Sequence, residues 1–162
     1  MLNRDVLARN PSLNIPNDGV AKVGRPANDN EWEVLRYELQ SFVCAGEYER
    51  GLDRVLDAYL GNLDQATQPA AWVSGFYGSG KSHFVRVLDA LWSDLAFPDG
   101  ARARGLVQNL PDAISAHLKE LSTRGLQSGG LWAASGEPHK GTSSPRLGLL
   151  DLLFNAAGLP QG

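Results

Sequence analysis

Apolar residues recur along most of the chain at intervals of three or four positions, and this period predicts five helices. The clearest lies between residues 47 and 63, where apolar side chains share one face and charged side chains take the other. The remaining four are predicted to begin after Asn30, at Lys81, near Pro111 and at Ser144. Two short apolar runs, 70–73 and 131–134, lack the helical period and are predicted as strands.

Capping signals mark the ends of two of these helices. In the helix predicted after Asn30, Glu33 is expected to act as a capping-box partner. The last helix has Ser144 at its N-cap, Pro145 at its first position and Gly158 beyond its end. Its side chains are apolar on nearly all sides, so we expect it to be covered on most faces.

The most specific motif follows the first predicted strand. Residues 75–82 read Gly-Phe-Tyr-Gly-Ser-Gly-Lys-Ser and match the phosphate-loop pattern G-x-x-x-x-G-K-[ST] at every fixed position. A glycine-rich turn that opens a helix directs backbone N–H groups and the positive end of the helix dipole at one anion. The motif therefore predicts a site for the phosphates of ATP, bound with Mg²⁺.

Several residues in and directly after this phosphate loop have predicted roles. Lys81 is the predicted catalytic residue, because it would reach the β- and γ-phosphates, and the Ser82 hydroxyl would coordinate magnesium. Tyr77 is expected at the outer rim, and the His83 side chain is expected to point away from Lys81 and Ser82. The predicted nucleotide-binding residues are Gly75, Tyr77, Gly78, Ser79, Gly80, Lys81, Ser82 and His83.

Composition excludes several classes of protein but does not indicate a reaction. The chain has 162 residues and a formal charge of −3, which argues against direct nucleic-acid binding by this piece. A single cysteine, Cys44, excludes an intramolecular disulfide. No apolar run is long enough to span a membrane, and no secretory signal precedes the first helix. We therefore expect a cytoplasmic protein with no membrane contact.

A hydrolytic P-loop enzyme also needs an acidic element, commonly an apolar strand that ends in Asp or Asp-Glu. The nearest match, 149–151, falls inside a predicted helix, and Asp89 and Asp94 are expected to be solvated surface charges. Two strands cannot make a stable sheet alone. We therefore predict an α/β fold: an incomplete P-loop NTPase core with N-terminal helices, truncated before the second acidic motif.

This prediction divides the chain into three parts. Residues 1–30 form an extended lead-in, 31–69 a helical segment, and 70–162 the N-terminal part of the P-loop NTPase domain.

The chain also resembles, from Ile15 to Leu159, the start of the large P-loop ATPases of bacterial BREX and Pgl phage-defence systems. The segments that carry the likeness are 15–23, 35–39, 42–52, 72–83, 97–101 and 156–160. The resemblance implies a AAA+-like ATPase that acts with other defence proteins, among them a DNA methyltransferase, and meets DNA only indirectly or through regions absent here. The full-length form would be a homo-oligomer.

Two further expectations accompany the resemblance. The chain lacks the acidic motif, sensors and arginine finger of such ATPases, so we expect it to bind nucleotide without efficient hydrolysis. Residues 17–23 are expected to form a structural turn, and adenine contacts from this segment are the alternative.

Two other functions fit the same motif. A small P-loop kinase or phosphotransferase would need lid arginines, for which Arg102, Arg104 and Arg124 are available. A non-catalytic module would bind nucleotide only for docking or assembly. Nucleotide affinity and turnover distinguish the three.

Overall fold

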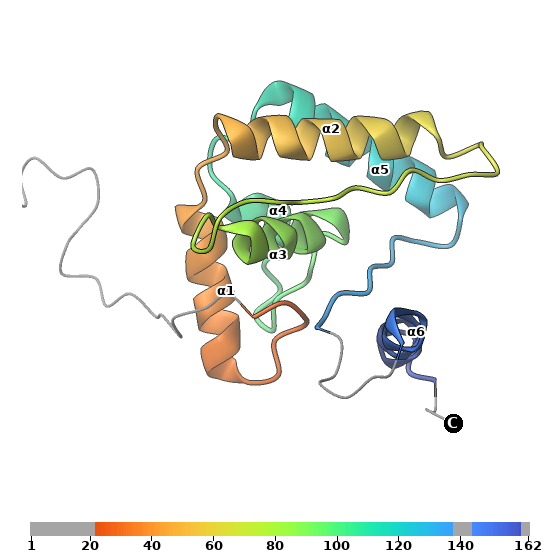
Figure 1. The fold of residues 1–162 in the computed structure, drawn as a ribbon. Helices are drawn as coiled ribbons and strands as arrows, with labels where there is room; N and C mark the ends of the chain where they lie inside the picture. The colour runs from red at the N-terminus through yellow and green to blue at the C-terminus, as the bar shows by residue number, and fades with distance from the viewer. Residues whose placement is uncertain (1–21, 138–143, 160–162) are drawn as a thin grey trace, which may run out of the picture.

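The computed structural model describes residues 22–137 and 144–159. In these ranges the chain forms six helices joined by loops (Figure 1). In chain order they are α1 (Asp29–Ser41), α2 (Glu47–Gly61), α3 (Lys81–Trp92), α4 (Ala103–Leu106), α5 (Asp112–Gln127) and α6 (Pro145–Ala156). The five predicted helices are thus confirmed, and the short α4 is an addition to them.

The core lies between α1, α2, α3 and α5, whose apolar stripes face one another. α2 packs along α5, while α3 contacts both α4 and α5. The largest fully buried side chains from these four helices are Leu35, Leu39, Leu52, Leu56, Val87, Leu91, Ile114 and Leu121. The helical period read from the sequence therefore selects the faces that are buried.

The N-terminus of α1 is capped two residues earlier than predicted, in an arrangement close to a capping box. The Glu31 amide donates to Asn28 Oδ1 at 3.0 Å, and Glu31 Oε2 accepts from the Ala27 amide at 2.8 Å. The predicted box at Asn30 and Glu33 has the same spacing, so the pattern alone did not distinguish the two registers.

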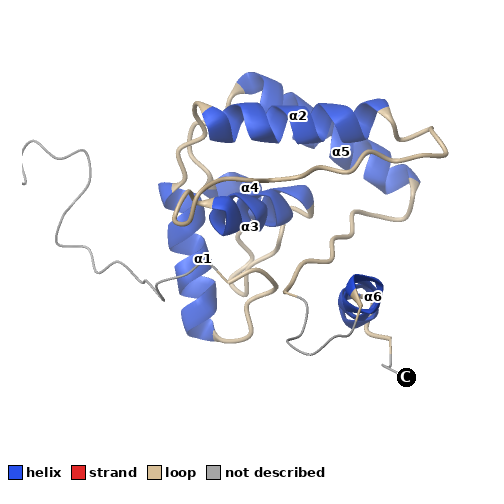
Figure 2. Ribbon diagram, in the orientation of Figure 1, coloured by secondary structure: helices blue, strands red, loops and turns tan. Residues whose placement is uncertain are grey.

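The predicted α/β fold is wrong. Within residues 22–137 and 144–159 there is no strand or sheet, and the one β-type contact is an isolated bridge between Ala96 and Arg102 (Figure 2). Residues 70–73 are extended but unpaired. The other candidate, 131–134, runs into Ser135, which hydrogen-bonds to Asp89 on α3. Neither segment pairs with a neighbouring strand, and without pairing an extended segment does not become a sheet.

The last helix shows the predicted start and end. Ser144 is the N-cap of α6, Pro145 is its first residue, and Gly158 adopts φ 66° just beyond its end. The expectation that it is covered on most faces is wrong, because Leu147 and Leu149 are exposed. α6 contacts the segment before it: a Cβ on Gly136 would lie 2.5 Å from the Leu152 side chain.

Several predictions fall wholly or partly outside the described residues. Of the lead-in 1–30, residues 1–21 lie outside them, and of the segment 17–23 only Lys22 and Val23 are described. Lys22 forms an ion pair of 3.1 Å with Glu31 of α1. None of the helices in the described ranges has the length and apolar character needed to cross a membrane.

Candidate functional site

The phosphate loop, defined as residues 75–82, has the backbone conformation that its glycines permit. Gly78 and Gly80 adopt φ angles of 78° and 80°, in the left-handed region that other residues enter at a cost. The Ser79 amide donates to the Phe76 carbonyl at 3.2 Å and closes a tight turn. The loop ends at Gly80, the N-cap of α3.

Lys81 folds back over the loop that precedes it. Its Nζ donates to the carbonyl oxygens of Gly75 at 2.9 Å and Phe76 at 2.7 Å. The Ser79 Oγ lies 3.5 Å from the same nitrogen. The ammonium group thereby joins the two ends of the loop into a ring and holds a positive charge at its mouth.

The first turn of α3 supplies further donors. The Phe84 amide makes the first helical bond, to the Gly80 carbonyl at 2.8 Å. The amides of Lys81, Ser82 and His83 have no acceptor among the described residues, as is usual for the first residues of a helix. Three unpaired N–H groups, the helix dipole and the lysine therefore surround one point with positive potential.

Two glycines of the phosphate loop are packed so closely that a larger side chain would clash. A Cβ on Gly75 would lie 2.6 Å from Ser79 Oγ, and one on Gly80 would lie 2.0 Å from the Tyr48 hydroxyl. Tyr48 belongs to the first turn of α2, so the phosphate loop rests directly on that helix. The sequence motif did not indicate this contact.

An aromatic cluster supports the loop from the side of α1 and α2. The Tyr48 ring stacks on Phe84 with centroids 6.2 Å apart, and its edge meets Phe42 at 5.5 Å. The His83 ring lies 5.7 Å from Phe42. Burial, with a smaller effect of the Arg86 charge, lowers the pKa of His83 and so favours the neutral ring. Its side chain packs in this cluster, and only its backbone amide belongs to the donor set.

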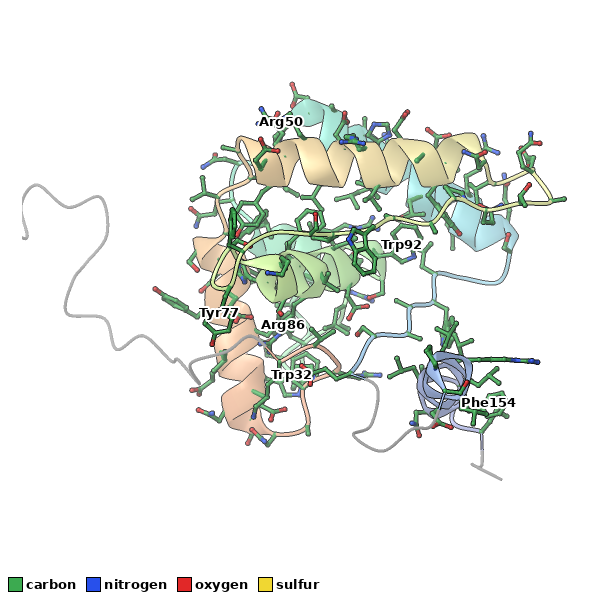
Figure 3. All side chains as sticks on the ribbon, viewed as in Figure 1. Trp32, Arg50, Tyr77, Arg86, Trp92 and Phe154 are labelled. Atoms are coloured by element: carbon green, nitrogen blue, oxygen red, sulfur yellow. The ribbon has the colours of Figure 1, made fainter. Side chains whose placement is uncertain are left out.

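Tyr77 lies at the tip of the loop and contributes no side-chain contact to it. Its side chain is 99% exposed and points away from the molecule (Figure 3). Ser82 is also exposed, on the first turn of α3. The donor set fits a phosphate tail, and the Ser82 hydroxyl fits a magnesium ion that takes its other ligands from phosphate oxygens and water. No group of three His, Cys, Asp or Glu suited to a metal occurs in the described residues.

The acidic residues are not the solvated charges that the sequence predicted. Asp89 is half-buried on α3, where its Oδ2 accepts from Ser135 Oγ at 2.8 Å, and burial raises its pKa despite that hydrogen bond. Asp94 Oδ1 accepts from the Arg104 amide at 3.1 Å. Asp151 lies inside α6, as predicted. Asp89 follows Ser82 by about two helical turns, roughly 10 Å along α3.

The arginines considered as a kinase lid are engaged elsewhere. Arg104 donates to the carbonyls of Leu91 at 2.7 Å, Trp92 at 3.1 Å and Leu118 at 2.9 Å. The bonds to Leu91 and Trp92 cap the C-terminus of α3, at the opposite end from the phosphate loop, and the bond to Leu118 ties that end to α5. Arg124 pairs with Glu120 at 3.4 Å and lies 3.7 Å from Asp64. Arg102 Nη1 donates to the Asp94 carbonyl at 3.1 Å, so all three arginines make their contacts away from the phosphate loop.

A buried ion pair fixes α3 against α1. Arg86 Nη1 lies 3.0 Å from Glu38 Oε2, and burial raises the pKa of Glu38 although the Arg86 charge opposes that shift (Figure 3). Arg86 follows Ser82 by four residues, so this pair restrains the helix that carries the loop residues. The sequence analysis did not identify it, because both residues read as ordinary surface charges.

A groove adjoins the phosphate loop. It lies between α2 and the extended segment 69–76 and has a volume of about 840 Å³. Gly75, Ser79, Gly80 and Lys81 form one end of it.

Comparison with known proteins adds no family to this description. No protein-family model matches the chain, and no solved structure matches it either.

Proposed function

We propose that the phosphate loop binds the triphosphate tail of ATP, with Mg²⁺ held by the Ser82 hydroxyl. The observation that carries the proposal is the ring closed by Lys81, with the unpaired amides of the first turn of α3 beside it. Backbone donors and a lysine around one anion position are the recognition chemistry of phosphate loops. The residues proposed to bind phosphate are Gly75, Gly78, Ser79, Gly80, Lys81 and Ser82.

Binding without efficient hydrolysis is the form of this function that we propose for the chain. Asp89 is hydrogen-bonded to Ser135, has a raised pKa and lies about two turns from Ser82, which argues against it as the residue that prepares an attacking water. The engaged Arg104 likewise argues against a kinase lid. On the resemblance described above, the bound nucleotide would serve a BREX- or Pgl-type phage-defence ATPase.

Titration calorimetry with Mg·ATP tests the proposal. Charge-assisted hydrogen bonds contribute about 1.5–3 kcal/mol, so Lys81→Ala should weaken binding by about 10- to 150-fold. Lys119→Ala removes the same charge from an exposed position on α5 and should leave affinity unchanged. Equal affinity in the wild type and Lys81→Ala, or no binding by the folded wild type, would refute the proposal. Phosphate release by the wild type at an ordinary turnover rate would refute its non-hydrolytic part.

A further inference from the structure

The groove beside the phosphate loop is continuous with the proposed phosphate site. Its volume of about 840 Å³ lies within the range of small-molecule sites, about 300–1,000 Å³. The extended segment 69–76 forms one wall as it runs back along α2 toward α3 (Figure 1). A ligand held at Lys81 can therefore extend into the groove without leaving the protein surface.

The two walls of the groove offer different chemistry. On α2 the lining residues include the aromatic Tyr48, the aliphatic Val55 and Ala58, and the oppositely charged Glu47 and Arg54. Arg54 makes no ion pair with any described residue, whereas its neighbour Arg50 pairs with Glu47. A planar cation that makes no ion pair can stack on an aromatic base or donate to a ribose hydroxyl.

The opposite wall is the extended segment 69–76, whose backbone is largely free of internal hydrogen bonds. Between residues 70 and 75, no N–H or C=O takes part in a backbone hydrogen bond with the described part of the chain, although the Gly75 carbonyl accepts from Lys81. An extended backbone of this kind presents alternating donors and acceptors, which match the polar edge of a nucleobase. The groove thus combines hydrogen-bonding groups, an aromatic ring and a cation.

We infer that this groove binds the nucleoside end of the nucleotide, with Arg54 as the side chain that holds it. The inference rests on the proposed function, because the phosphate loop must first hold the phosphates. It adds a specificity element: the chain would prefer a nucleoside triphosphate over a bare triphosphate. Arg54 and the wall 70–75 would supply that preference, while Lys81 and the amides of α3 would supply the phosphate affinity common to both ligands.

The test compares the dissociation constants of Mg·ATP and Mg·tripolyphosphate for the full chain. We expect the wild type to bind Mg·ATP at least 10-fold more tightly. Arg54→Ala should reduce that ratio several-fold, and Ala58→Trp, which fills the groove, should bring it close to one. Neither variant should change the affinity for tripolyphosphate. Arg124→Ala, which removes an equal charge outside the groove, should keep the wild-type ratio.

The results that would contradict these expectations distinguish the inference from the proposed function. A wild-type ratio near one, or an unchanged ratio in both groove variants, overturns the inference while tripolyphosphate binding upholds the phosphate site. Failure of the folded wild type to bind either ligand overturns the proposed function as well. Circular dichroism and thermal melts establish folding, and Arg54→Ala keeps the test decisive if Ala58→Trp does not fold, because Arg54 is exposed.

Discussion

The helical core and the segment 67–79 contact each other, but different interactions determine their structures. In the core, buried side chains decide the structure: Leu52 and Leu56 of α2 have no exposed surface. In the segment, Trp72 and Phe76 are 91% and 92% exposed, and glycine conformations and the Lys81 hydrogen bonds determine the path. Apolar side chains are therefore packed in the helical core, whereas the large apolar side chains of the segment 67–79 are exposed.

The largest predicted effect is on stability, and it compares the same Leu→Ala substitution at a buried and at an exposed position. Leu52→Ala should lower the free energy of unfolding by about 3 kcal/mol, because it leaves a cavity among fully buried neighbours. Leu126→Ala on α5 makes the same chemical change at a position that is 80% exposed, and it should cost at most about 0.5 kcal/mol. Urea unfolding of both variants measures the difference. Similar losses would mean that the core is not where the structure places it.

The same contrast explains what the sequence could predict. Helical periodicity located all five longer helices and the buried faces of α1, α2, α3 and α5, because burial selects apolar residues at that period. It failed at 70–73, where an apolar run read as a strand has neither a neighbouring strand nor a buried face. The fold class followed that error. Chemistry at residues 75–82 was predictable in outline, because a phosphate loop is encoded locally by its glycines and lysine.

The remaining site features depend on tertiary contacts that no local pattern encodes. The Tyr48 hydroxyl lies against Gly80, which is 32 positions later, and Arg86 reaches back to Glu38. Arg104, a candidate lid residue by composition, caps the far end of α3 instead. A tyrosine at the start of the preceding helix was the one available signal, and its helical spacing marked it only as a core residue.

A substitution inside the phosphate loop should give an intermediate effect and separate function from stability. Gly80→Ala forces a Cβ into the left-handed region and against the Tyr48 hydroxyl, so we expect about 1–2 kcal/mol lower stability. Because the loop would move, Mg·ATP affinity should fall by at least 10-fold at temperatures where the variant is folded.

Gly61→Ala is the matched control for that change. Gly61 is the last residue of α2, has no positive φ and has open space where a Cβ would be placed. It should be neutral or stabilising by up to about 1 kcal/mol, with unchanged affinity. Unaltered nucleotide binding by Gly80→Ala would show that the loop conformation does not matter for binding.

The smallest predicted effect concerns α3, which begins directly after the segment 67–79 and packs in the helical core. Burial raises the pKa of Asp89 above its ordinary value of 3.8, so the folded protein holds a proton on this carboxyl more readily than the unfolded chain does. The associated stability is therefore complete below pH 3.8 and is lost as the pH rises through the folded pKa. Asp89→Asn removes the titration, and its amide oxygen can still accept from Ser135.

The stability difference between Asp89→Asn and the wild type should accordingly be near zero at the acid end and should grow in favour of the variant as the pH rises to 7. Urea unfolding at several pH values measures this slope. Ser135→Ala removes the donor that favours the charged form, so in that variant the pKa of Asp89 should rise further and the loss of stability with pH should be larger. A stability difference between Asp89→Asn and the wild type that does not change with pH would mean that this carboxylate is solvated, because its pKa would then be the same in the folded and the unfolded chain. It would then belong with the exposed loop rather than with the core.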